Sequence, residues 1–163
     1  MTRRSRVAIG ILAFFAVTLI AFGVGDVLAG VSADPGITKA ISGMTPAEVQ
    51  AEDPTGYRLY DFATRTNGLN LAMLGTLMTA IVLVPYRAGQ RWAWRVMWTL
   101  PAWALSVPLA YLVAGIAPEQ PPAPPMVSGV IVAVVAGAAL LIDRVRFAAS
   151  EATPTPELAP ATA

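Results

Sequence analysis

The fold of this chain is decided by the stretch VAIGILAFFAVTLIAFGVGDVLAG, residues Val7–Gly30. A helix of this length, at about 1.5 Å per residue, crosses the roughly 30 Å hydrocarbon core of a bilayer. Three more apolar stretches of crossing or nearly crossing length follow at Asn67–Pro85, Trp92–Ala117 and Met126–Ile142. The sequence therefore predicts an integral membrane protein with four transmembrane helices.

The first stretch also has marks of a signal peptide, because it follows three arginines and precedes the small-residue sequence Val31-Ser32-Ala33. The apolar core of a signal peptide has about 7–15 residues, however, whereas this run is longer and is followed by three further spans. We therefore expect an uncleaved first helix.

Hydrophobic residues make up 56% of the chain and charged residues only 13%, so no segment beside the four spans is able to build a separate soluble core. The sequence predicts an all-α membrane protein: one four-helix transmembrane bundle over residues 1–146, up-down-up-down, with a short helical extracytoplasmic cap between the first two helices. The predicted segments are helices at about 7–30, 59–86, 92–117 and 126–145, an outer loop at 31–58, and a disordered cytoplasmic tail at 147–163.

Two residue types are missing from the chain, histidine and cysteine. Their absence excludes histidine-ligated haem, zinc or copper, imidazole acid–base catalysis, thiolate catalysis and iron–sulfur ligation. We expect no cofactor and no metal site. The net charge of +1 gives no indication of a nucleic-acid partner, and the preference for arginine over lysine is typical of a GC-rich bacterial genome.

The positive charges predict the orientation of the helices. Eight basic residues fall on one side of the predicted bundle: Arg3, Arg4, Arg6, Arg87, Arg91, Arg95, Arg144 and Arg146. Only Lys39, Arg58 and Arg65 fall on the other side, alongside Asp34, Glu48, Glu52, Asp53, Asp61 and Glu119. By the positive-inside rule, both termini are expected in the cytoplasm, with the chain in a bacterial cytoplasmic membrane.

The connection between the first two spans has helical signals of its own. The motif Thr45-Pro46-Ala47-Glu48 has the spacing of a capping box with proline at the first helical position, so a short helix is expected to begin at Pro46. The sequence Asp34-Pro35-Gly36 is typical of a turn. A disordered loop is the alternative, because isolated short helices are marginal in water.

Two spans contain residues that shape helix packing. Pro101 and Pro108 are expected to kink the third span, either as a hinge or as a simple packing irregularity. Gly129, Ala133 and Gly137 form a small-residue stripe on the fourth span. Such a stripe permits close helix contact, either within the chain or across a homodimer.

Six residues of the second span share one helical face because their spacing is 4-3-4-3-4, namely Asp61, Arg65, Gly68, Ala72, Gly75 and Thr79. Asp61 precedes Arg65 by one turn, the favourable orientation for a helical ion pair. Asp26, near the outer end of the first span, and the amides of Asn67 and Asn70 lie at similar depth. The candidate binding residues are Asp26, Asp61, Arg65 and Asn70, and no residue is a candidate for catalysis or metal ligation.

Two interpretations of this cluster stay open. In the first, Arg65 pairs with Asp61 or Asp26 and holds the outer layer of the bundle together. In the second, these groups line an outward-facing pocket for a lipid headgroup or a small anion. No ionisable residue is expected at the bilayer midplane, which argues against proton-coupled multidrug transport and against a voltage sensor.

A family resemblance lies in the inner turn Pro85-Tyr86-Arg87-Ala88-Gly89-Gln90-Arg91-Trp92-Ala93-Trp94, preceded by the Thr45–Glu48 motif and Asp53-Pro54. This pattern resembles bacterial four-helix membrane proteins with a Tyr-Arg-x-Gly-x-Arg-Trp-Ala-Trp turn, superficially like the DoxX-type bundles. The resemblance covers Met44 to Pro101 and implies a four-helix bundle without an established activity. DoxX-like proteins have been linked to redox partners or quinones, whereas this chain lacks cysteine and histidine.

The sequence favours a non-enzymatic accessory or interaction subunit as the function. The alternative is a binder or carrier of a lipid-like or small anionic molecule in a pocket beneath the outer cap. An enzyme ranks third, because neither Asp26 nor Asp61 has a catalytic partner beyond Arg65. The expected partners are the lipid bilayer and a membrane protein or a second copy of the chain, and not nucleic acid.

Overall fold

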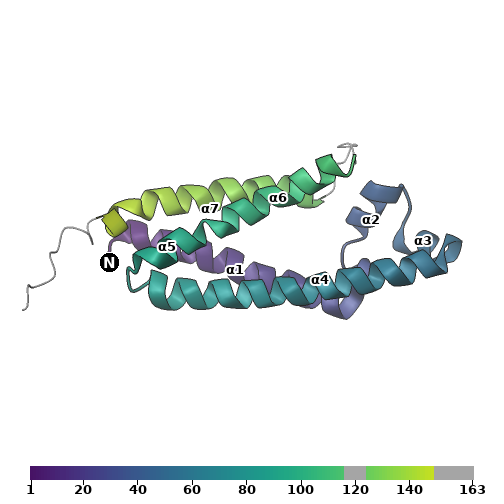
Figure 1. Ribbon diagram of the computed structural model, residues 1–163, viewed down its shortest axis with the longest axis horizontal. Coiled ribbons are helices and arrows are strands. Elements are labelled where there is room, and N and C mark those ends of the chain that lie inside the picture. Colours follow the sequence, from purple (N-terminus) through teal and green to yellow (C-terminus); the bar gives the residue numbers. More distant parts are fainter. Residues whose placement is uncertain (116–123, 149–163) are drawn as a thin grey trace, which may run out of the picture.

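The computed structural model describes residues 1–115 and 124–148, and these residues are helical apart from turns and short connections. Four helical segments of the described chain are long and apolar enough to cross a membrane (Figure 1). They are Arg3–Ala33, Pro54–Tyr86, Arg91–Val113 and Pro124–Ala148. These findings confirm the predicted all-helical chain with four helices of membrane-crossing length and composition.

The elements follow one another as α1 (Arg3–Ala29), the 3-10 turn η1 (Gly30–Ala33), α2 (Pro35–Ser42), α3 (Pro46–Glu52), α4 (Pro54–Ile81), the π-helical turn η2 (Val82–Tyr86), α5 (Arg91–Met97), α6 (Thr99–Val113) and α7 (Pro124–Ala148). Helix α7 continues through Phe147, which is buried in the core, so the predicted start of the tail at residue 147 is too early. The remainder of that predicted tail lies outside the described residues.

The connection between α1 and α4 is helical for most of its length. As predicted, Thr45 caps α3: its Oγ1 accepts a hydrogen bond from the Glu48 N–H, and the Glu48 carboxylate accepts one from the Thr45 N–H at 2.7 Å. The bond from the Thr45 N–H lowers the pKa of Glu48. The predicted turn at Asp34 begins a helix instead, because its side chain accepts from the Gly36 N–H and Pro35 has the φ of a first helical residue.

Proline interrupts the third spanning segment where the sequence predicts a kink. Helix α5 ends at Met97 and α6 begins at Thr99, just before Pro101. Pro101 has no N–H to donate to the Met97 carbonyl, and its ring crowds the preceding turn, so the helical hydrogen bonds are broken there. Pro108 lies inside α6 without ending it. The segment is therefore interrupted once rather than at each proline.

Helices α1 and α4 pack with their backbones in direct contact because glycines lie between them. A Cβ atom on Gly75 would lie 2.7 Å from the Ala16 carbonyl oxygen and 2.8 Å from the Ile20 nitrogen. One on Gly23 would lie 2.5 Å from the Ala72 nitrogen, so the two helices run antiparallel. This contact uses the small-residue face of the second span that the spacing predicted.

The small-residue stripe of the fourth span packs inside the chain. A Cβ atom on Gly129 would lie 2.6 Å from the Ala104 carbonyl oxygen and 2.9 Å from the Pro108 ring, both in α6. Ala133 and Gly137 are also buried. The stripe therefore makes its close helix contact within the chain, and a homodimer through the stripe would have to displace α6.

The two ends of the bundle differ (Figure 1). At one end, formed by the start of α1, the α4–α5 turn and the end of α7, large side chains such as Tyr86, Phe147 and Leu12 are fully buried. At the other end, α1 and α4 diverge from α6 and α7, and α2 lies in the gap (Figure 1). We call these the closed end and the open end.

A buried polar cluster ties three segments together at the closed end. Ser5 Oγ of α1 donates to Asp143 Oδ1 of α7 at 2.6 Å, and Asp143 is only 2% exposed. The other oxygen of Asp143 lies 3.7 Å from Arg146 Nη1. Arg146 Nη2 in turn donates to the carbonyl of Arg87, in the turn after η2. Each segment at the closed end therefore has a polar contact to a neighbour.

Candidate functional site

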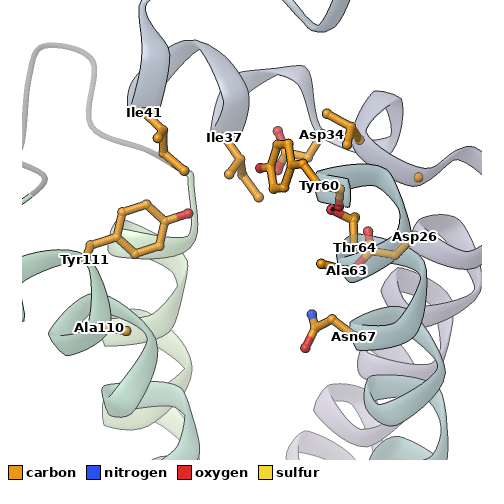
Figure 2. Close-up of a pocket in the computed structure, with 12 residues that line it drawn as sticks. Asp26, Asp34, Ile37, Ile41, Tyr60, Ala63, Thr64, Asn67, Ala110 and Tyr111 are labelled. Atoms are coloured by element: carbon orange, nitrogen blue, oxygen red, sulfur yellow. Dashed lines mark hydrogen bonds between the residues drawn. The ribbon is translucent and has the colours of Figure 1, made fainter. Parts of the chain in front are cut away.

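A cavity of about 420 Å³ lies at the open end, between the end of α1, η1, α2, α4 and α6 (Figure 2). Much of its wall is apolar, with Val31, Ile37 and Ala110 as examples. Its polar side chains are Asp26, Asp34, Tyr60, Thr64, Asn67 and Tyr111. Small-molecule sites have volumes of roughly 300–1,000 Å³, so this cavity, the open-end pocket, has the size of a binding site.

Local backbone turns place α2 beside the pocket. Gly30 ends α1 with a φ of 58°, a left-handed value that favours glycine. The turn η1 then redirects the chain, and Asp34 caps α2 so that Ile37 and Ile41 face the pocket (Figure 2). Because α2 also contacts the start of α7, it bridges the two diverging helix pairs.

The pocket lies near one boundary of the spanning segments. Asn67 is roughly 28 Å along the helix from Tyr86 at the closed end, at about 1.5 Å per residue. Asp26 is roughly 30 Å from Arg6 by the same measure. These lengths match a hydrocarbon core of about 30 Å, so the polar groups of the pocket belong at a membrane interface and not at the midplane.

The described residues that line the pocket include two carboxylates and no basic side chain. Asp34 accepts a hydrogen bond from the Gly36 N–H at 3.0 Å, whereas the Asp26 carboxylate has no hydrogen bond or ion pair with any described residue. The phenol rings of Tyr60 and Tyr111 complete the polar wall (Figure 2). Carboxylates beside aromatic rings attract a positive charge, so this chemistry suits a cation better than an anion.

Arg65 is directed toward the end of α1 and does not line the pocket. Its Nε donates to Asp61 Oδ2 at 2.7 Å, and its Nη1 donates to the carbonyl oxygens of Val27 and Leu28 at 2.6 and 3.1 Å. Asp61 Oδ1 accepts from the Val31 N–H at 3.0 Å. The ion pair therefore caps α1 and holds η1 against α4, which agrees with the structural interpretation of this cluster.

The structure places the four candidate binding residues in different roles. Asp61 and Arg65 bond to each other, Asp26 lines the pocket without contacting Arg65, and Asn70 is exposed outside it. Asn67 lines the pocket instead. The pocket face of α4 is thus displaced by one residue, about 100° of helical rotation, from the face that the spacing singled out.

Five polar pocket residues were not among the candidates, namely Asp34, Tyr60, Thr64, Asn67 and Tyr111. Tyr60, Thr64 and Asn67 are spaced 4-3 along α4, like the residues of the predicted face. This spacing alone indicates that the three side chains share one face of the helix. Tyr111 comes from α6, and its position opposite α4 depends on how the interrupted third segment packs. No spacing within one helix indicates that position.

Replacing Arg65 with methionine is expected to lower the free energy of unfolding by about 1–2 kcal/mol. The change removes one ion pair and two hydrogen bonds to α1 carbonyls. The expected loss of unfolding free energy is small because Arg65 is 42% exposed and solvent weakens its ion pair. Thermal unfolding of the detergent-solubilised chain measures the effect. Arg58→Met is the matched control, because Arg58 is exposed on the same helix without a partner in the described chain. Equal melting of the two variants would contradict the capping role.

Among the described residues, no group of three or more His, Cys, Asp or Glu is placed to hold a metal ion. No protein-family model, no curated protein and no solved structure matches the chain. The resemblance to DoxX-like bundles therefore stays a prediction. The function has to be inferred from the geometry of the site.

Proposed function

We propose that this chain is a membrane protein that binds a small organic cation, or the cationic head of a lipid-like molecule, in the open-end pocket. The proposal rests on one observation: Asp26 faces a cavity of about 420 Å³, and its carboxylate has no positively charged partner among the described residues. Asp34 adds a second carboxylate to the same wall. The ligand class is therefore an ammonium or a similar organic cation.

The physical argument for a cation is one of charge and shape. A carboxylate at the edge of the hydrocarbon region is poorly solvated, and an ammonium group beside it would offset that cost. The faces of Tyr60 and Tyr111 add cation–π attraction, worth about 0.5–2 kcal/mol. Ile37 and Ile41 offer an apolar surface to the carbon atoms of the ligand.

We also propose the orientation that this function needs. Both termini lie in the cytoplasm, the four spans run up-down-up-down, and α2 and α3 form a cap on the extracytoplasmic side of a bacterial cytoplasmic membrane. The three segments that contain the eight predicted inner arginines meet at the closed end, which supports this orientation. The open-end pocket then faces the outside of the cell.

Choline is expected to bind the wild-type chain about tenfold more tightly than 3,3-dimethylbutan-1-ol, which has a similar shape without the charge. Asp26→Asn is expected to remove most of this preference, because it deletes the charge and keeps the side-chain size. Isothermal titration of the full chain in maltoside detergent, free of choline lipids, measures both affinities.

Glu52→Gln is the matched control for this test. Glu52 lies at the end of α3, is exposed, and does not line the pocket, so its removal changes the net charge by the same amount. The affinity of the Glu52→Gln variant for choline should stay within about twofold of wild type, because exposed charges at a distance are screened. Equal binding of choline and the neutral alcohol, or no binding of either, would overturn the proposal and favour an accessory subunit.

A further inference from the structure

A second cavity lies at the closed end, on the outside of the bundle between the start of α1 and the end of α7. Its volume is about 560 Å³. Two alanines, Ala8 and Ala139, line it and are each only 2% exposed, whereas the larger Val7 and Ile142 beside them are more than half exposed. Small buried residues flanked by larger exposed ones leave an apolar groove along the helix pair, which we call the closed-end groove.

One end of the closed-end groove is strongly basic. Arg3 and Arg4 line it, both are exposed, and neither has a partner in the described chain. The nearby carboxylate of Asp143 does not neutralise them, because one of its oxygens accepts from Ser5 and the other faces Arg146. Two guanidinium groups are therefore available at the point where the apolar part of α1 begins.

We propose that the closed-end groove binds an anionic glycerophospholipid. The phosphate would lie between Arg3 and Arg4, since guanidinium groups bind phosphate oxygens in a bidentate manner. One acyl chain would lie along Val7, Ile11 and Ile142, which line the same cavity on the side toward the membrane interior. Basic pockets between spanning helices on the cytoplasmic side bind anionic headgroups, and the closed end is that side in the orientation proposed above. This proposal does not depend on the ligand of the open-end pocket.

Native mass spectrometry of the full detergent-solubilised chain tests the site, with phosphatidylglycerol and phosphatidylcholine of the same acyl chains as probes. Wild type is expected to bind phosphatidylglycerol at least about tenfold more tightly than phosphatidylcholine, since each arginine near an anionic headgroup strengthens the binding of the lipid. The double variant Arg3→Gln with Arg4→Gln should reduce this ratio to about two or less.

Two further variants make the test specific. Arg87→Gln with Arg144→Gln removes the same charge from exposed positions at the same end that do not line the groove, so the lipid ratio should stay near wild type. Arg3→Lys with Arg4→Lys keeps the charges that orient the helix but loses bidentate geometry, so an intermediate ratio of about three is expected. The lysine variant also keeps the test valid if the glutamine variant fails to insert.

Three outcomes would overturn the proposal. The first is an unchanged lipid ratio in the glutamine variant. The second is an equal loss in the Arg87/Arg144 control, which would mean general attraction to the basic end of the bundle. The third is displacement of phosphatidylglycerol by millimolar inorganic phosphate, which would mean that the acyl chain contributes nothing and that the groove does not hold a lipid.

Discussion

Asp143→Ala is expected to lower the free energy of unfolding by about 2–4 kcal/mol, the largest effect of any single substitution proposed for this chain. Asp143 is 2% exposed, accepts from Ser5 Oγ at 2.6 Å and lies 3.7 Å from Arg146 Nη1. Removing the carboxylate leaves the buried Ser5 hydroxyl without its acceptor and the Arg146 guanidinium without its counter-charge. Tryptophan fluorescence during unfolding in SDS reports the change, because Trp94 stacks on Phe147 at the same end.

A double-mutant cycle separates the hydrogen bond from other effects of this change. Ser5→Ala alone and Ser5→Ala combined with Asp143→Ala should reveal a coupling of about 1.5–3 kcal/mol, as for a hydrogen bond to a charged group. The neighbouring Arg144→Ala is the control, because Arg144 is exposed and its loss should change stability by less than about 0.5 kcal/mol. Additive effects of the two single variants would refute the coupling.

Gly75→Val is expected to separate α1 from α4 and to cost about 1–3 kcal/mol of stability. The added Cβ atom would lie 2.7 Å from the Ala16 carbonyl oxygen and 2.8 Å from the Ile20 nitrogen. Backbone atoms cannot rotate aside as a flexible side chain does, so the whole helix has to move. The expected result is a lower melting temperature of the detergent-solubilised chain, measured by circular dichroism.

Gly10→Val provides the matched control for Gly75→Val. Gly10 lies in α1, is exposed, and a Cβ atom there would meet no atom of the described residues within 4 Å. Both substitutions change helix propensity equally, so only the packing differs between them. If the two variants melt at the same temperature, the close backbone contact does not stabilise the bundle.

The parts of the fold that the sequence predicts well are those decided within one helix. Apolar length indicates the four spanning segments, and the capping box at Thr45 places the start of α3 at Pro46, where the structure has it. The interruption near Pro101 follows from its missing N–H. Each of these features depends on residues close together in the chain.

The site is harder to predict because it depends on helices that are distant in the sequence. Tyr111 and Ile37 face the same pocket, yet no spacing relates α6 to α2. The spacing on α4 correctly predicts a face that contacts another helix, but that helix is α1. The pocket is lined by α4 residues one position earlier in the sequence. A change of one residue rotates the face by about 100°, so small errors in register exchange packing residues for pocket residues.

The two proposed sites lie at opposite ends of α1. Arg3 and Asp26 are separated by roughly 35 Å along the helix, at about 1.5 Å per residue. This separation exceeds a Debye length of about 8–10 Å at physiological salt, so charge changes at one site should leave affinity at the other unaltered. The lipid test and the choline test are therefore independent.

The hydrogen bond between Ser5 and Asp143 joins residues 138 positions apart, which has a consequence for the order of assembly. A chain is made from its N-terminus, so the antiparallel pair of α1 and α4 can form as soon as Tyr86 has left the ribosome. The closed end has to wait for α7, which is synthesised after the other three described spanning segments. The closed-end groove needs Ala139 of α7, and the open-end pocket needs Tyr111 of α6, so both proposed sites are completed only after the pair of α1 and α4 has been made.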